Sequence, residues 1–374
     1  MNGHGLVMGK FYPPHNGHHD VIRRAADECE RVTVVVVAAS VESIPLADRV
    51  GWLREEHSSE SNVAVVGAKC DSPVDVTSDV VWRAQTATVR AALRLATAAP
   101  VDVVYSAEDY GDELAARLDA KHLRVGRAPR APSSTAVRRD LVSAWSTLAP
   151  ATRAGLATRA IVVGGESTGT TTVSRAVADR FRARGGVWDR TECVPEFGRE
   201  FTEVKWDRER LAARSTGRSE PALADIEWTV SDFDEVALEQ TRRENRAARS
   251  GSPVLVCDTD AFATSVWERR YLGTASRPLQ PWATDLARRD VYLLTDHTDV
   301  PWQDDGLREG DLAIRAAMTN WFEDALTNAG HSWVLLTGSL DERVDLAVRT
   351  VDQVMRPRLH FAAPLSGTGF DHDC

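Results

Sequence analysis

The chain has 374 residues, of which 43% are hydrophobic and 27% charged, and a formal net charge of -10 at pH 7. The length predicts two or three domains and the composition is typical of a soluble globular protein, whereas the acidic balance argues against a general nucleic-acid binder. The five cysteines show neither metal-ligand spacing nor a disulfide framework, and no apolar run is long enough to cross a bilayer, so we expect a cytoplasmic protein without a membrane partner.

The first predicted structural unit is a βαβ unit that contains two histidines. Residues 5–9 form a short apolar strand, residues 17–29 show the apolar spacing of a helix, and residues 31–39 form a valine-rich strand of the kind found in buried parallel sheets. His15 and His18 lie where the strand ends and the helix begins, where imidazoles and backbone N–H groups can converge on a triphosphate. Such fixed donors suit nucleotidyl transfer because they stabilise the charge that builds on the α-phosphate. Histidines that only cap a turn are the alternative.

Two tryptophans and one polar turn add candidate ligand contacts to this half of the chain. Trp52 and Trp82 are each able to stack on a flat ring, with packing as the alternative role. A strand at residues 101–105 ends in a polar turn, and ligands of open α/β sheets collect at that end of a strand.

A second helix start follows at residues 132–141. Ser134, Thr135 and Arg138 are spaced so that hydroxyls, N–H groups and a guanidinium share one surface that can hold phosphate. A plain capped helix explains the serines equally well, but not their combination with the two histidines.

Together, the segments Gly9-Lys-Phe-Tyr-Pro-Pro-His-Asn-Gly-His18 and Ser133-Ser-Thr-Ala-Val-Arg138 resemble the two signatures of the nucleotidylyltransferase superfamily, in particular of nicotinamide mononucleotide adenylyltransferases. The resemblance implies a Rossmann-like domain over residues 1–150, with nicotinamide mononucleotide beside Trp52 and Trp82. It assigns ATP binding to Gly9, Lys10, Phe11, His15, His18, Ser134, Thr135 and Arg138, of which His15, His18 and Arg138 are catalytic. Adenylylation of another phosphate substrate, such as a phosphopantetheine-like one, is the alternative.

The second domain, expected over residues 151–356, begins with a phosphate-binding motif. An apolar strand at residues 160–163 runs into Gly164-Gly-Glu-Ser-Thr-Gly-Thr-Thr-Thr172, which opens on a helix. Such a turn directs backbone N–H groups and the positive end of a helix at a phosphate chain. Compared with G-x-x-x-x-G-K-[ST], Thr170 stands where lysine is expected and Thr171 supplies the Mg²⁺-binding hydroxyl. A glycine-rich turn that merely joins a strand to a helix is the alternative.

Later segments supply carboxylates and arginines to the same sheet. The apolar strand at residues 253–257 ends in Asp258 and Asp260, and P-loop folds use such aspartates to hold Mg²⁺ or to orient the attacking hydroxyl. Arg308 and Arg315 follow the next core strand and can fold over ATP to neutralise the transferring phosphoryl group. An ordinary solvated loop is the alternative reading of that segment.

Three connecting or terminal segments are also predicted. Residues 209–219 are polar and charged, which is typical of a solvated connection, and residues 225–249 form a long helix with one apolar side. Residues 357–374 show no periodicity, so we expect a disordered tail.

Four segments of the second half resemble the nicotinamide riboside kinase half of the bifunctional NadR family. They are the phosphate-loop segment, Pro195-Glu-Phe-Gly-Arg-Glu200, Cys257-Asp-Thr-Asp-Ala-Phe-Ala-Thr264 and Pro301-Trp-Gln-Asp-Asp-Gly-Leu-Arg308. With the first half, the resemblance covers nearly everything from residue 5 to about residue 355. It implies two reactions of NAD supply: ATP-dependent phosphorylation of nicotinamide riboside, and adenylylation of nicotinamide mononucleotide to NAD with release of pyrophosphate.

The same resemblance assigns residues in the second domain. ATP is expected to contact Gly164, Glu166, Ser167, Thr168, Gly169, Thr170, Thr171, Thr172, Arg308 and Arg315. Mg²⁺ is expected on Thr171 and Asp258, with Asp258 also catalytic. The riboside candidates are Glu196, Arg199, Asp258, Asp260, Trp302 and Asp305.

The chain departs from the family pattern in two places. Members that repress transcription carry a helix-turn-helix ahead of the first strand, and only four residues precede Gly5 here, so no DNA partner is expected. Thr170 removes the loop lysine, which predicts a slower kinase or, as an alternative function, an NAD- or ATP-sensing protein with an inactive kinase half. A homo-oligomer is compatible with the sequence.

Overall fold

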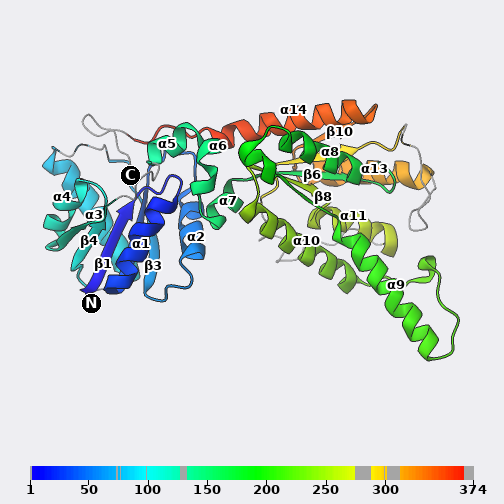
Figure 1. Cartoon of the computed structure of the whole chain (residues 1–374), viewed down its shortest axis with the longest axis horizontal. Coiled ribbons are helices and arrows are strands. Elements are labelled where there is room, and N and C mark those ends of the chain that lie inside the picture. Colours follow the sequence, from blue (N-terminus) through cyan, green and yellow to red (C-terminus); the bar gives the residue numbers. More distant parts are fainter. Residues whose placement is uncertain are drawn as a thin grey trace. The chain divides into compact units, whose positions relative to one another are not determined.

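The computed structural model describes residues 2–72, 75, 77–97, 99–126, 133–273, 288–298, 300 and 312–365. The chain divides into two compact units, one made of Met1–Leu156 with Pro357–Cys374 and the other of Ala157–Arg356. Each unit contains a five-stranded parallel sheet with helices packed against it (Figure 1). The predicted fold class, a Rossmann-like α/β domain followed by a P-loop domain with a parallel sheet, is therefore confirmed.

The first unit alternates strands and helices along the chain. Its elements are β1 (Asn2–Gly9), α1 (Asn16–Glu28), β2 (Cys29–Ala38), α2 (Leu46–Glu56), β3 (Val63–Lys69), α3 (Asp79–Ala96), β4 (Val103–Ser106), α4 (Tyr110–Leu118), β5 (Lys121–Arg124), α5 (Ser134–Arg139), α6 (Leu141–Ala144) and α7 (Pro150–Leu156). The strands β3 and β5 were not predicted, because β3 follows a polar stretch and β5 is short and mostly polar.

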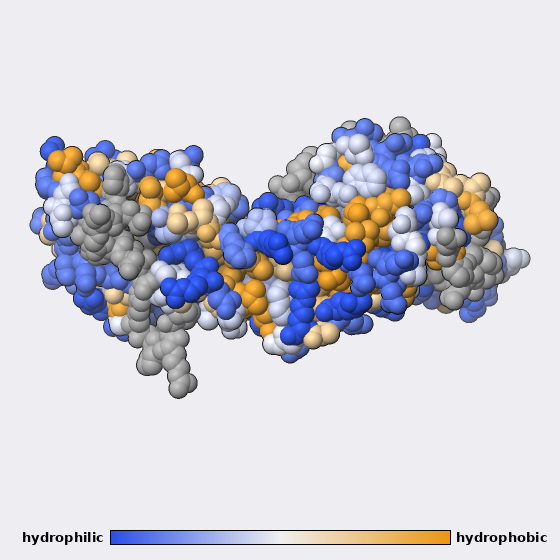
Figure 2. Space-filling model, turned by 90° about the horizontal axis from the view of Figure 1, so that it is seen from above, coloured by the Kyte–Doolittle hydropathy of each residue, from blue (hydrophilic) through white to orange (hydrophobic). Residues whose placement is uncertain are grey.

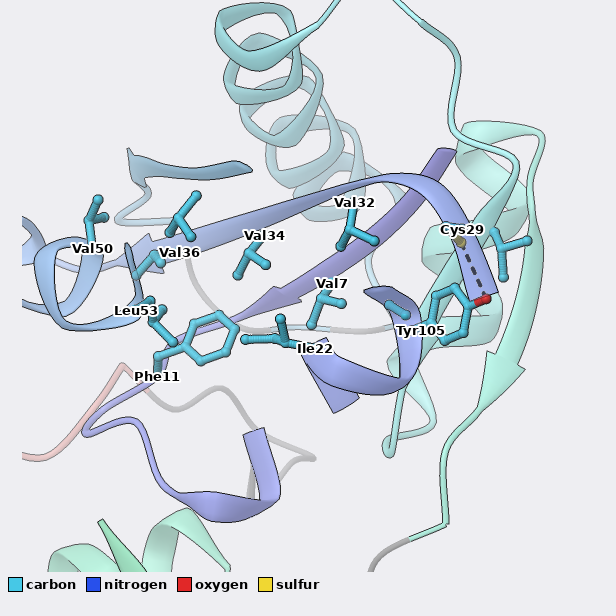
Figure 3. Close-up of a cluster of buried hydrophobic side chains, with 13 residues drawn as sticks. Val7, Phe11, Ile22, Cys29, Val32, Val34, Val36, Val50, Leu53 and Tyr105 are labelled. Carbon is cyan, nitrogen blue, oxygen red and sulfur yellow. Dashed lines mark hydrogen bonds between the residues drawn. The ribbon is translucent and has the colours of Figure 1, made fainter. Parts of the chain in front are cut away.

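The first sheet has the strand order β3-β2-β1-β4-β5. On one face, Val7 of β1 and the valines of β2 pack against Ile22 of α1 and Leu53 of α2 (Figure 3). On the other face, Leu6 packs with apolar residues of α3 and α4. The chain builds outward from β1 first through β2 and β3 and then through β4 and β5, so the order reverses between β1 and β4. Ligands of open α/β sheets bind at such a reversal, outside the carboxyl ends of the strands.

The second unit is built in the same way around a central strand. Its elements are β6 (Thr158–Gly164), α8 (Thr170–Arg182), β7 (Glu192–Val194), α9 (Phe197–Ser215), α10 (Val230–Ser250), β8 (Val254–Asp258), α11 (Ala261–Leu272), β9 (Val291–Thr295), α13 (Leu312–Asn328), β10 (Trp333–Leu336) and α14 (Leu340–Leu359), the last of which enters the first unit at Pro357. The strand order is β10-β9-β6-β8-β7, so the phosphate loop after β6 lies beside the carboxyl end of β8.

Two predictions about connecting segments were wrong. Residues 209–215 continue the helix α9, which extends away from its sheet (Figure 1), because ion pairs such as Arg214 with Glu220 stabilise a charged helix that few apolar contacts cover. The first part of the expected disordered tail is also ordered. Residues 357–359 end α14, and the carbonyl of Ala362 accepts a hydrogen bond from the Tyr12 hydroxyl at 3.0 Å.

Hydrophobic residues on the face seen in Figure 2 form groups between hydrophilic ones. Within the described ranges, no helix combines the length and the apolar character needed to span a bilayer.

Candidate functional sites

A crevice opens at the carboxyl ends of β1 and β4, where the strand order of the first sheet reverses. Gly9 and Phe11 line it from the end of β1, and the polar turn from Ser106 to Tyr110 lines it from the end of β4. His15, His18 and Ser134 complete its wall. The topology therefore brings both sequence signatures to the position where a ligand is expected.

Ser134 links the two signature histidines. His15 Nε2 lies 3.0 Å from Ser134 Oγ, and His18 Nε2 lies 3.4 Å from the same oxygen. The two imidazole rings pack against each other with their centroids 3.8 Å apart. Because 119 positions of sequence separate His15 from Ser134, only the parallel sheet can bring them together.

The backbone at the start of α1 orients His18. His15 is the N-cap residue of this helix, and its backbone N–H donates to His18 Nδ1 at 3.2 Å. In the neutral imidazole of His18 the proton therefore lies on Nε2, the atom that is 3.4 Å from Ser134 Oγ in the crevice wall. His18 thus presents a fixed N–H donor beside the first amides of a helix, an arrangement that stabilises negative charge on phosphate oxygens.

Arg138 and Thr135 are held together on α5. Arg138 Nη2 donates to Thr135 Oγ1 at 3.1 Å, and Arg138 Nη1 donates to the carbonyl of Tyr12 at 3.2 Å. The guanidinium therefore connects the second signature to the loop of the first. Neither side chain lines the described crevice, whose wall on this side is formed by Ser133 and Ser134.

Lys10 lies beside the crevice and has other partners. Its Nζ is 3.2 Å from Glu42 Oε1 and donates to the carbonyl of Leu365 at 3.1 Å. Glu42 in turn pairs with the fully buried Arg49 at 2.7 Å. A phosphate would therefore share the Lys10 ammonium, which has three N–H donors, with these two partners.

The two tryptophans expected at nicotinamide mononucleotide do not reach the crevice. Trp82 is 5% exposed and belongs to the core between the sheet and α3, with Arg117 over its ring. Trp52 of α2 packs so closely on Gly155 of α7 that a Cβ there would overlap its indole. Both positions serve packing, because a helix face that covers a sheet buries its largest side chains.

The phosphate loop of the second unit joins β6 to α8 through two residues with positive φ. Ser167 has φ 57° and Gly169, the N-cap residue of α8, has φ 88°. Gly164 is enclosed by the hydroxyls of Thr168 and Thr295, which a Cβ at that position would hit. Thr168 Oγ1 donates to the carbonyl of Gly165 at 2.8 Å and thereby closes the turn. The loop keeps the form of an anion cradle although Thr170 replaces lysine.

Thr171 and Asp258 meet at the mouth of this cradle. Thr171 Oγ1 donates to Asp258 Oδ2 at 2.6 Å, and Asp258 is 3% exposed at the end of β8. Burial raises the pKa of Asp258, while hydrogen bonds from Thr171 and Thr170 oppose that rise. A hydroxyl and a carboxylate beside a phosphate cradle match the oxygen ligands that Mg²⁺ prefers. No group of three or more histidine, cysteine or acidic side chains able to hold a metal occurs in the described part of the chain.

A cavity of about 560 Å³ extends from the phosphate loop. Of the predicted ATP residues, those from Gly164 to Thr172 line it, with the exception of Thr168, which is buried under the turn. Glu196 and Arg199, from the start of α9, line the opposite side together with Gln240 of α10. With Asp258, three of the riboside candidates therefore line the same cavity as the phosphate loop.

Asp260 is not part of the cavity wall. It is fully buried, caps α11 by accepting from the backbone N–H of Ala263 at 2.9 Å, and accepts from the Tyr292 hydroxyl at 2.8 Å. Arg289 forms an ion pair with the same carboxylate. Asp260 therefore anchors α11 to the sheet instead of facing a riboside.

Arg315 does not close over the cavity. It is 1% exposed and lies under the phosphate loop, where its Nη2 donates to the carbonyl of Ser167 at 3.0 Å. The prediction failed because Arg315 lies on α13, a packed helix, and not on a surface loop. Trp302, Asp305 and Arg308 lie outside the described residues.

An aromatic wall of the cavity was missed by the sequence analysis. Trp228 lies just before α10, Phe233 lies in its first turn, and Trp267 and Tyr271 come from α11. The Trp228 ring lies 5.2 Å from Tyr271 and 5.4 Å from Phe233, and the Tyr271 hydroxyl donates to Glu166 Oε1 of the phosphate loop at 3.2 Å. The available signal was the i, i+4 spacing of Trp267 and Tyr271 after the aspartates, which places both rings on one face of a helix.

Comparisons with known proteins agree with a division into two α/β units. Residues 6–112 match the cytidylyltransferase-like family, and residues 159–343 match the AAA domain family. The chain is 22% identical over 337 residues to the trifunctional NAD biosynthesis/regulator protein NadR of Salmonella typhimurium, covering 86% of this chain and 76% of that protein. The protein of the same name from Escherichia coli is 22% identical over 81% of this chain and 71% of its own length.

Two solved structures share the fold along nearly the whole chain. A NadR protein in complex with NR superposes with a TM-score of 0.61 at 19% identity, covering 95% of this chain and 96% of that one. A NadR protein in complex with NAD and AMP-PNP gives a TM-score of 0.61 at 20% identity, covering 95% and 97% of the two chains.

Proposed function

The chain is a NadR-type protein, and on that premise we propose that it carries out two reactions of NAD synthesis, one in each unit. The second unit phosphorylates nicotinamide riboside with ATP, and the first adenylylates nicotinamide mononucleotide to NAD with release of pyrophosphate. The contact that carries the proposal is Ser134 Oγ within 3.4 Å of both signature histidines. The ligands named for the related structures, NR, NAD and AMP-PNP, support these substrate classes.

In the reaction of the first unit, a phosphate oxygen of the mononucleotide attacks the α-phosphorus of ATP. The bond from the α-phosphorus to the oxygen that bridges it to the β-phosphorus breaks, and pyrophosphate leaves. Negative charge builds on the α-phosphate oxygens during the transfer. His18 Nε2–H and the amides at the start of α1 face that charge, and Ser134 fixes the two imidazoles in place. No covalent enzyme intermediate is required.

In the reaction of the second unit, the riboside hydroxyl attacks the γ-phosphorus of ATP, and ADP leaves. Asp258 accepts the hydroxyl proton or holds the metal, and the loop amides hold the phosphates. Thr171 and Asp258 would hold Mg²⁺, which supplies charge neutralisation for the transferring phosphoryl group when bound. Glu196 and Arg199 line the same cavity, which supports their proposed contact with the riboside, and the aromatic wall is suited to its flat ring.

Thr170 favours a second candidate, an NAD- or ATP-sensing protein whose kinase half binds nucleotide without turnover. The Thr171–Asp258 pair argues against it, because a site that only binds does not need a base beside the metal ligand. Adenylylation of another phosphate substrate in the first unit is the remaining alternative.

The test supplies the substrates separately. Wild type, His18→Ala and Asp258→Asn are each incubated with MgATP and either nicotinamide riboside or its mononucleotide, and ADP and NAD are measured. We expect the mononucleotide to yield NAD with wild type and Asp258→Asn but not with His18→Ala. We expect the riboside to yield ADP with wild type and His18→Ala but not with Asp258→Asn. Absence of ADP from wild type supplied with the riboside would reject the kinase, and absence of NAD from wild type supplied with the mononucleotide would reject the mononucleotide as a substrate.

A further inference from the structure

Two buried arginines lie directly behind the phosphate loop of the second unit. Arg315 of α13 is 1% exposed and Arg343 of α14 is 3% exposed. Arg315 Nη2 donates to the carbonyl of Ser167 at 3.0 Å, and Arg343 Nη1 donates to the carbonyl of Thr168 at 3.3 Å. Both guanidiniums thus contact the backbone whose opposite side presents N–H groups to the cavity.

The charge of Arg315 is not matched by a nearby carboxylate. Its hydrogen bonds go to the backbone carbonyls of Ser167, His297 and Val300, and across the described ranges no acidic side chain forms an ion pair with it. The Arg315 Nε is also buried, and no described residue forms a hydrogen bond with it. Arginine stays protonated in proteins, so this is a buried cation. Such a charge is unfavourable unless an anion compensates it, and a phosphate chain in the cradle in front of the loop would supply one.

The loop itself carries no cation. Thr170 stands at the lysine position, and its hydroxyl, like that of Thr171, hydrogen-bonds Asp258. From the loop itself a triphosphate therefore meets backbone amides and two hydroxyls but no positive side chain, whereas Arg199 and Arg270 line the cavity from α9 and α11. Two positive groups one backbone layer away still act on it strongly, because little water separates them from the phosphates.

We propose that Arg315, with Arg343 beside it, supplies from behind the phosphate loop the positive charge that a loop lysine would supply from within the cavity. The inference rests on the proposed kinase function and concerns how its nucleotide is selected. It makes Arg315 a positioning and electrostatic residue that does not touch the ligand. A site built in this way prefers ATP over ADP, and ADP over uncharged adenosine, in proportion to phosphate charge.

The test compares ligands of graded charge on a double-mutant cycle. MgATP, MgADP and adenosine are titrated by calorimetry into the full-length protein with His15→Ala and His18→Ala, which weaken the first site. In that background we compare the unchanged loop, Thr170→Lys, Arg315→Met and the double variant. Arg180→Met, an exposed change on α8 that removes only a surface ion pair with Asp345, is the matched control.

We expect Arg315→Met to weaken ATP binding by about tenfold, ADP binding less and adenosine binding not at all, since the lost interaction scales with ligand charge. Thr170→Lys should restore ATP binding in the Arg315→Met protein by a larger factor than it raises ATP binding with Arg315 present. With Arg315 present, the new ammonium and the guanidinium repel each other across the loop, and this cost is absent in Arg315→Met. Arg180→Met should match the background protein.

Two results would overturn the charge role. One is an equal loss of ATP and adenosine binding in Arg315→Met, which would mean that Arg315 only shapes the loop; the other is an additive effect of Thr170→Lys. If Arg315→Met does not fold, Arg315→Lys is used instead, and loss of the preference for ATP over adenosine in that charge-conserving variant contradicts the proposal. Failure of the unchanged loop to bind either ATP or ADP would instead reject the kinase function itself.

Discussion

Thr171 and Asp258 are joined by a 2.6 Å hydrogen bond across 87 positions of sequence. The bond connects the first turn of α8 to the end of β8, and it holds the hydroxyl and the carboxylate at the mouth of one cradle. The pair forms because β6 and β8 are parallel neighbours, so the loop after one strand faces the residue that ends the other.

Asp258→Asn should lower kinase turnover by about 100-fold or more, because the carboxylate charge is lost while its shape is kept. The same variant should be more stable than wild type at neutral pH. Burial raises the folded-state pKa of Asp258 above its ordinary 3.8, so folding favours the protonated carboxyl. The stability that this protonated form contributes is lost as the pH rises from 3.8 through the folded-state pKa. The measurement is riboside-dependent ADP release together with melting temperature at several pH values. A variant less stable than wild type at neutral pH would contradict the stability part.

Ser134→Ala should reduce NAD formation by about 10- to 100-fold, mainly through kcat, because the two imidazoles lose their common partner. Removal of the buried hydroxyl should also cost about 1 kcal/mol of stability. Ser78→Ala, which removes the N-cap contact of α3 with Val81, controls for stability alone. If both variants reduce NAD formation equally, Ser134 has no role beyond folding.

A buried histidine pair predicts acid sensitivity of the first unit. His19 Nδ1 lies 2.9 Å from His57 Nε2, and burial lowers the pKa of His19 from 6.5 to about 3. Its neutral form therefore contributes stability that is complete above 6.5 and is lost as pH falls toward about 3.

In His19→Leu this contribution disappears. Between about pH 7 and about pH 5 the wild-type protein should lose about 1–2 kcal/mol more unfolding free energy than the variant. Urea unfolding at the two pH values measures the difference. Parallel losses in both proteins would show that His19 is protonated in the folded state.

The ordered C-terminal segment should stabilise the loop of the first signature. Phe361 packs on Tyr12 at 5.5 Å between ring centroids, and the backbone N–H of Ala362 donates to Ser43 Oγ at 3.2 Å. Truncation after His360 removes these contacts and should cost about 1–2 kcal/mol. Truncation after Leu365, which keeps them, is the matched control. Equal melting temperatures for the two truncations would contradict the prediction.

Sequence alone predicted a large part of this protein correctly. Valine-rich strands, helical apolar spacing and two glycine-containing turns identified two α/β units with parallel sheets, since these patterns depend on local backbone geometry and on burial of both sheet faces. The sequence assigned His15, His18 and Ser134 to one candidate nucleotide site, whereas the contacts of both histidines with Ser134 were found only in the tertiary structure.

The errors share one physical cause, which is that burial depends on tertiary neighbours. Asp260 and Arg315 were expected at ligands and Trp82 at a flat ring, yet all three are buried by neighbours far away in the chain, which the local sequence does not reveal.

The sequence by itself determined most of the elements, their order and two turns with the pattern of a phosphate-binding loop, because each of these follows from short-range spacing; it did not reveal β3 and β5. Only the tertiary structure decided which polar groups face a cavity and which lie beneath it. That choice depends on contacts between segments far apart in the chain, such as α13 under the phosphate loop and α11 beside Glu166.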